Sequence, residues 1–287
     1  MQQGDALLYQ QVSPGGPLAP YIVCFWLLKA PAHLLPERER RPADGYIDVV
    51  FQFTGAYKQS PADRHRETPA LRRSAVLGQR SQGYVSEPAG DTHCLAIRFQ
   101  PGGLAAFTPL PVHELTDQAV DLNCIWGHAV TEWEERLVNA LSLEHAGGLL
   151  TRILCSRFKD RPSLRAVQAA VQQIDASDGN VSVRTLADAF GWSQKHLERL
   201  FAQQVGLSPK HYARIARFRR LSRFAARPRS DRPMGLLAAD FGYYDQSHLT
   251  REVTSLAGVA PREFFSLWCP VCGGAPLHLQ GCPNQQR

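Results

Sequence analysis

Two sets of polar side chains in the last third of the sequence have the chemistry to hydrogen-bond with nucleic-acid bases. The first set contains Gln194 and Arg199, and the second contains Gln246 and Arg251. Glutamine can make two hydrogen bonds to adenine, and arginine can make two to guanine. Because the glutamine and the arginine have the same spacing in both sets, the sequence predicts two equivalent base-contacting surfaces.

These two sets belong to a longer internal repeat. Its two copies are offset by 51 residues up to a shared glycine and by 52 after it, so the second copy has one additional residue in its turn. The identical pairs are Leu186 and Leu237, Ala187 and Ala238, Phe190 and Phe241, Gly191 and Gly242, Gln194 and Gln246, His196 and His248, Leu197 and Leu249, Arg199 and Arg251, Gly206 and Gly258, and Pro209 and Pro261.

Each copy predicts a helix, a tight turn and a second helix. In the first copy the apolar spacing favours a helix over 181–190, and Gly191 supplies the left-handed backbone of the turn. Ser193 is an expected N-cap for a helix over 194–205. This arrangement is typical of a helix-turn-helix unit, whose second helix enters the major groove. The residues expected to contact DNA at the two second helices are Ser193, Gln194, Lys195, His196, Arg199, Asp245, Gln246, Ser247, His248 and Arg251. For Arg199 and Arg251, a salt bridge within the domain is the alternative.

Positive charge is concentrated in the same region. Residues 163–267 contain 15 Lys/Arg and 9 Asp/Glu, which accounts for the whole net charge of +6. The segment 210–232 has nine basic residues, and neutralising phosphates with such residues drives DNA binding. A helix over 209–226 would link the two units, leaving Arg214, Arg217, Arg219, Arg220 and Arg223 for phosphate or solvent. Such a linker would hold the two reading helices roughly 34 Å apart, one turn of B-DNA.

Residues 163–267 resemble the carboxy-terminal DNA-binding domain of AraC/XylS-type transcription regulators. The resemblance rests on the segment 242–251 (GYYDQSHLTR), followed by Gly258, Pro261 and Phe264. It implies seven helices, binding to promoter DNA, activation or repression of transcription, contact with RNA polymerase, and no enzymatic activity. It also implies that DNA binding needs no cofactor. The first unit has the more basic face, so we expect it to dominate base reading.

Residues 1–160 are predicted to form an effector-sensing or dimerisation domain. Short strands rich in β-branched and aromatic residues are expected at 46–53, 75–78 and 94–99, and helices at 116–158. The segments 18–26, 44–53 and 96–103 resemble an uncharacterised sensor-like domain found ahead of such regulators. The expected fold is therefore a two-domain protein: an α+β, antiparallel β-rich domain followed by helices, and an all-α domain with two helix-turn-helix units joined by a linker helix.

A small-molecule effector is an expected partner of the first domain, and a homodimer is a candidate assembly. An aromatic-lined pocket is conceivable, although an ordinary sheet core is favoured for the same side chains. They are Tyr21, Phe25, Trp26, Phe51, Phe53 and Phe99. Asp91, His93 and Cys94 are neighbours in sequence, but strand alternation separates them, so core or surface roles are favoured over a site.

The last segment, 268–287, has the spacing of a metal site. Cys269, Cys272, His278 and Cys282 supply four ligands within fourteen residues, enough for a closed tetrahedral structural Zn²⁺ site. The alternative is a tail with reactive thiols.

Two other functions are compatible with parts of the sequence. Alkylation-repair proteins combine a cysteine methyl acceptor with an AraC-like domain, but Cys94 and Cys155 lack the expected flanking residues. A thiol-based redox sensor could use Cys24, Cys94, Cys124 or the tail. The sequence shows neither a secretory signal nor a membrane-spanning segment, so we expect a bacterial cytoplasmic, nucleoid-associated protein.

Overall fold

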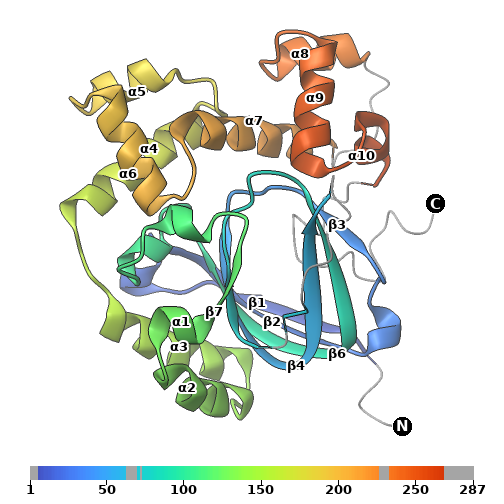
Figure 1. The fold of residues 1–287 in the computed structure, drawn as a ribbon, viewed down its shortest axis with the longest axis vertical. Coiled ribbons are helices and arrows are strands. Elements are labelled where there is room, and N and C mark those ends of the chain that lie inside the picture. Colours follow the sequence, from blue (N-terminus) through green and yellow to red (C-terminus); the bar gives the residue numbers. More distant parts are fainter. Residues whose placement is uncertain (1–5, 63–69, 72, 226–232, 268–287) are drawn as a thin grey trace.

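The first domain is built on a curved antiparallel sheet that lies below the helical domain in the computed structural model (Figure 1). The structure describes residues 6–62, 70–71, 73–225 and 233–267. Within these residues the sheet has seven strands in the order β1-β2-β6-β4-β5-β7, with β3 paired to β6. Their bounds are β1 Leu8–Val12, β2 Ile22–Ala30, β3 Glu39–Arg41, β4 Ile47–Pro61, β5 Ala75–Leu77, β6 Tyr84–Phe99 and β7 Ala119–Asp121.

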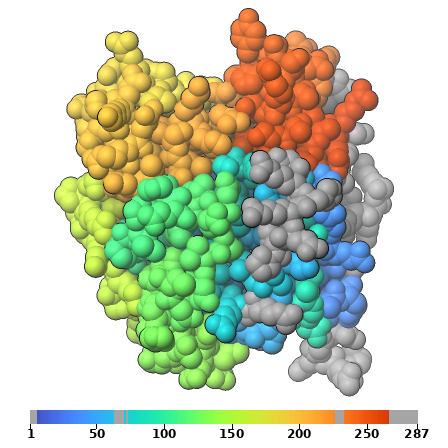
Figure 2. All heavy atoms as spheres, viewed as in Figure 1, coloured from blue at the N-terminus to red at the C-terminus, as the bar shows by residue number. Residues whose placement is uncertain are grey.

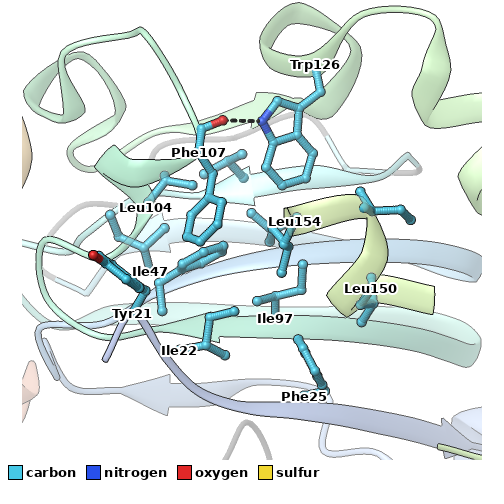
Figure 3. Close-up of a cluster of buried hydrophobic side chains, with 14 of the residues drawn as sticks. Tyr21, Ile22, Phe25, Ile47, Ile97, Leu104, Phe107, Trp126, Leu150 and Leu154 are labelled. Carbon is cyan, nitrogen blue, oxygen red and sulfur yellow. Dashed lines mark hydrogen bonds between the residues drawn. The ribbon is translucent and has the colours of Figure 1, made fainter. Parts of the chain in front are cut away.

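A hydrophobic core fills the space between one face of the sheet and three helices, α1 (Leu122–Trp126), α2 (Ala129–Val138) and α3 (Leu143–Arg157). Figure 3 shows part of it, where the Trp126 indole Nε1 donates to the Phe107 carbonyl at 3.1 Å. Tyr21, Phe25, Phe51 and Phe99 are buried in this core, and Phe53 packs against it. The sheet-core prediction is therefore confirmed for these five aromatic residues. Trp26 belongs to a smaller cluster.

Helices α4 to α10 form the second domain, whose described residues thus contain the seven helices that were expected. They are α4 Pro162–Ala176, α5 Val183–Ala189, α6 Gln194–Gln204, α7 Pro209–Ala225, α8 Met234–Asp240, α9 Gln246–Ala257 and α10 Pro261–Leu267. None of the described helices has the length and apolarity needed to cross a membrane.

The first of these helices, α4, begins at a proline. Arg161 is the N-cap residue and Pro162 occupies the first turn. Proline suits the first helical position because its fixed φ is already helical and its missing N–H has no partner there. Leu164, just inside α4, is buried in the core of the first domain. The second domain therefore begins against the core of the first, although Lys159, Asp160 and Pro162 at the junction are exposed.

Candidate nucleic-acid interface

The two helix-turn-helix units have the same capped turn. Gly191 and Gly242 both have positive φ, at 65° and 73°. The Ser193 hydroxyl accepts a hydrogen bond from the His196 N–H at 3.2 Å, and the Asp245 carboxylate accepts from the His248 N–H at 2.6 Å. The predicted turns and N-caps are confirmed. Each cap fixes the start of the helix that would enter the groove.

The additional residue of the second turn is Tyr244. The N–H groups of Trp192 and Tyr243 donate to equivalent carbonyls, those of Ala187 and Ala238, so these two aromatic residues correspond. Tyr244 then has no counterpart in the first unit. Its side chain is 93% exposed and directly precedes the cap of α9. Sequence reasoning did not include it among the DNA contacts, although the change of offset marked its position.

The glutamines at the start of each second helix project into solvent. Gln194 and Gln246 are both exposed, as are their neighbours Lys195 and Ser247. These positions lie in the first turn of α6 and α9, the part of a recognition helix that contacts base edges. The structure therefore brings together the predicted reading residues in each unit.

The two arginines of these helices are also exposed. Among the described residues, neither Arg199 nor Arg251 forms an ion pair with an acidic side chain. Arg199 instead donates to Gln203 Oε1 at 3.3 Å and contacts the His196 ring nitrogen at 3.3 Å. Both guanidinium groups therefore remain accessible to DNA.

The two histidines are less accessible than expected. The His196 ring lies edge-on to Trp192 with centroids 5.4 Å apart, and the His248 ring lies edge-on to Tyr243 at 5.5 Å. Both side chains are half-buried. Each histidine ring packs its recognition helix against the aromatic residue of the preceding turn, so only part of the ring can face DNA.

All five linker arginines contact groups within the domain, so the expectation that they are free for phosphate or solvent is wrong for most of them, although the Arg223 side chain is still 73% exposed. Arg214 forms an ion pair with Glu252 at 2.9 Å, Arg217 donates to the Gly179 carbonyl at 3.0 Å, and Arg219 pairs with Asp175. Arg220 and Arg223 both contact Asp178, at 3.4 and 3.1 Å. The acidic partners come from α4, the loop after it and α9, so these pairs join the linker helix to both units.

A groove remains between the two units. Its cavity of about 540 Å³ is lined by Lys210, Arg214 and Arg217 of α7, by the segment 179–183 and by His248 and Glu252 of α9. The Lys210 ammonium is exposed, and no acidic partner for it is found in the described part of the chain. A phosphate backbone passing between two major-groove segments would meet cations here.

The amino-terminal domain donates a hydrogen bond to each helix-turn-helix unit at an equivalent glycine of the repeat. The Thr116 hydroxyl donates to the Gly206 carbonyl, and Arg40 Nη1 donates to the Gly258 carbonyl, both at 2.7 Å. A Cβ atom on Gly258 would lie 2.3 Å from that of Ala62, so only glycine permits this approach. The C-terminal ends of α6 and α9 therefore face the first domain, and Figure 2 shows the two units side by side on top of it.

The cysteines of the described residues form no candidate metal centre. No group of three or more His, Cys, Asp or Glu suited to a metal is found there. Burial raises the pKa of the Cys24 thiol to about 11 and that of Cys94 to about 12, which disfavours their reactive thiolates. Cys124 and Cys155 are exposed free thiols. Cys269, Cys272, His278 and Cys282 lie outside the described residues.

Two family models match separate parts of the sequence. Residues 10–121 match a domain of unknown function, DUF6597, and residues 186–266 match a helix-turn-helix domain. No curated protein matches the chain.

Solved structures of ToxT from Vibrio cholerae are similar over most of the chain. A 1.65 Å structure has 9% identity and a TM-score of 0.45, with 90% of this chain and 97% of ToxT covered. A structure of wild-type ToxT with a bound unsaturated fatty acid has 9% identity and a TM-score of 0.44, covering 93% and 98%. The capped repeat and the match to residues 186–266 identify the carboxy-terminal domain as an AraC-type helix-turn-helix domain, which in this chain follows a DUF6597 domain.

Proposed function

We propose that this protein is a sequence-specific regulator of transcription that binds promoter DNA with both helix-turn-helix units under the control of its amino-terminal domain. The observation that carries the proposal is the pair of equivalent, capped recognition helices whose first turns expose Gln194 and Gln246. Exposed Arg199 and Arg251 add a second bidentate donor to each helix. The amino-terminal domain contacts the opposite ends of these helices, so it does not cover their reading ends.

The proposed DNA contacts remain those expected from the sequence, and four of them also have a structural role. Ser193 and Asp245 cap the helices that they precede. Arg214 and Arg217 bond the linker helix to Glu252 and to the Gly179 carbonyl. Each of these residues therefore has a structural role in addition to any contact with DNA. Lys210 is the better candidate for a phosphate contact. We assign residues 1–160 to the control domain, 163–267 to the DNA-binding domain and 268–287 to the tail.

The proposal includes partners beyond DNA. RNA polymerase is the expected target of an activator, and a homodimer and a small-molecule effector are further proposals. DNA binding should need no cofactor, and a structural Zn²⁺ in the tail would order that segment without catalysis. Buried Cys94 does not suit a methyl acceptor. A single-turnover assay with alkylated DNA tests this: methyl transfer to one cysteine would replace the regulator proposal by a repair enzyme.

Binding to selected DNA tests the function directly. Duplexes enriched from a random pool by the purified protein should bind at least about a thousandfold more tightly than a scrambled duplex at physiological salt. Fluorescence anisotropy with labelled duplexes measures both affinities. Equal affinity for selected and scrambled DNA would exclude sequence-specific binding.

Removing the charge of Lys210 should weaken binding to every DNA sequence alike. If Lys210 contacts one phosphate, Lys210→Gln will reduce the slope of log K against log salt by about 0.9. Titrations at several salt concentrations measure this slope. Arg152→Gln is the control, because Arg152 is exposed on α3 in the amino-terminal domain. An unchanged slope for Lys210→Gln would show that no phosphate lies in the groove.

Truncating Tyr244 should weaken DNA binding without affecting folding. Its side chain has almost no protein contacts to lose, and a tyrosine at the start of a recognition helix can donate its hydroxyl to a phosphate. We expect Tyr244→Ala to lose about 0.5 to 1.5 kcal/mol of binding free energy, and Tyr244→Phe to lose most of the same amount. Leu141→Ala is the matched control, since Leu141 is equally exposed but lies in the amino-terminal domain. Wild-type affinity in Tyr244→Ala would remove this residue from the interface.

A further inference from the structure

Glu198 places an acidic side chain on the exposed face of α6. It lies three residues after Lys195 and four after Gln194, so the three side chains share one surface of the helix. Within the described part of the chain, its carboxylate forms no ion pair or hydrogen bond. We infer that Glu198 determines specificity in the first unit by accepting a hydrogen bond from the amino group of a cytosine. This inference rests on the proposed function and adds a residue to the predicted reading set.

The capping of α6 does not account for this charge. A glutamate at the third position of a helix can close a capping box, but the third residue of α6 is His196. Glu198 lies beyond the first turn, where a negative charge would stabilise the helix dipole. The cap itself is the Ser193 hydroxyl, which accepts from the His196 N–H. The carboxylate is therefore available to a partner outside the protein.

The neighbouring arginine is bonded to other residues. The Arg199 guanidinium donates to Gln203 Oε1 and contacts the His196 ring nitrogen, both at 3.3 Å. These two partners lie one turn after and one turn before Arg199, and neither of them is acidic. The exposed face of α6 therefore presents a guanidinium and a carboxylate to DNA as separate groups, and each can contact a different base.

A carboxylate on a DNA-reading face favours one base over the others. The phosphates repel it, so it lowers the affinity for DNA in general. Its contact becomes favourable only where the major groove presents a hydrogen-bond donor. Cytosine presents the N4 amino donor alone, adenine has the acceptor N7 beside its N6 donor, and guanine and thymine present acceptors. Cytosine is therefore the base that fits Glu198, and unfavourable contacts reject the other three.

The second unit lacks this acidic group. Thr250 is the equivalent residue, and it is uncharged. Its hydroxyl donates to the Gln246 carbonyl at 2.8 Å, so its proton is used within α9. Gln194 and Gln246 make the two units alike, whereas Glu198 makes them different. The DNA site should therefore be asymmetric, with a cytosine required in the segment that α6 reads and none required at the matching position of the segment that α9 reads.

Glu198→Gln in the full-length protein tests the inference, because it removes the charge and keeps the shape of the side chain. Fluorescence anisotropy measures affinities for the selected duplex and its single-base-pair variants. The segment that α6 reads is the one where Gln194→Ala changes the base preference. There the wild type should prefer one cytosine at least about fivefold over each other base. In Glu198→Gln this preference should be lost in favour of adenine, to which glutamine can make two hydrogen bonds.

Affinity for a scrambled duplex is the second measurement. Glu198→Gln should bind scrambled DNA about two- to fivefold more tightly than the wild type at low salt, because a charge that the phosphates repel has been removed. Glu135→Gln is the matched control, since it makes the same change of net charge at an exposed position of α2. It should change neither the base preference nor the affinity for scrambled DNA.

The inference is overturned if the wild type prefers no cytosine in the segment that α6 reads, or if Glu198→Gln keeps that preference. Tighter binding of scrambled DNA with an unchanged preference would also overturn it, because Glu198 would then act through its charge alone. A wild type that binds selected and scrambled duplexes equally would overturn the proposed function together with this inference. The wild-type measurement therefore distinguishes the two failures.

Discussion

Gln194→Ala will relax the base preference of the protein more than Gln246→Ala will. Both glutamines are exposed in the first turn of a capped helix, so each can bond a base edge. Loss of a bidentate contact costs about 1 to 3 kcal/mol of discrimination at one base pair, or roughly 5- to 150-fold. We expect the larger loss in the first unit, because Lys195 adds a positive charge where the second unit has Ser247.

Affinities for a selected duplex and for its single-base variants measure this discrimination. The variant should bind the selected duplex more weakly but lose its preference at one position only. Gln172→Ala is the control, since Gln172 is exposed on α4 and is not part of either unit's reading surface. If both Gln194→Ala and Gln246→Ala discriminate as well as the wild type, α6 and α9 are not the reading helices.

Phe201→Ala will strongly destabilise the first helix-turn-helix unit and weaken its contribution to DNA binding. The Phe201 side chain has no exposed surface and packs in the core between α6 and α7, with its ring 6.5 Å from that of Tyr212. Truncation of a buried phenylalanine typically lowers the free energy of unfolding by about 3 to 5 kcal/mol. Val253 is the equivalent residue of the second unit and is also fully buried, but its truncation removes fewer atoms.

Chemical denaturation followed by circular dichroism measures these losses. We expect Val253→Ala to lose less than half as much as Phe201→Ala. Phe201→Leu should lose less than Phe201→Ala, because leucine fills much of the volume that alanine leaves empty. A loss below about 1 kcal/mol for Phe201→Ala would mean that this core does not determine the stability of the first unit.

The features that local sequence determines were predictable. The caps Ser193 and Asp245 and the turn glycines Gly191 and Gly242 act on backbone within a few residues, so their types and spacing suffice to predict the turn. The seven helices followed from the repeat and the family resemblance. Strand alternation also explains the aromatic residues: Phe25 and Trp26 are neighbours, and only Phe25 belongs to the main core.

The features that depend on distant pairs were not predictable from one sequence. Arg214 was expected to face phosphate because its partner Glu252 lies 38 residues away, beyond the linker and the second turn. Thr116 and Arg40 reach the repeat glycines across 90 and 218 residues, and no local pattern reports such contacts. The short strand β3 carries no apolar alternation, because its two inward side chains are the charged Glu39 and Arg41.

Hydroxyl-radical footprinting of the full-length protein on a duplex selected from a random pool tests the central claim most directly. Two units held on one linker helix should protect two segments on the same face of the duplex, one helical turn or about 10 base pairs apart. Gln194→Ala should weaken protection mainly at one of them. A single short protected segment, or protection that is the same on scrambled DNA, would contradict the claim that both units read adjacent major-groove segments.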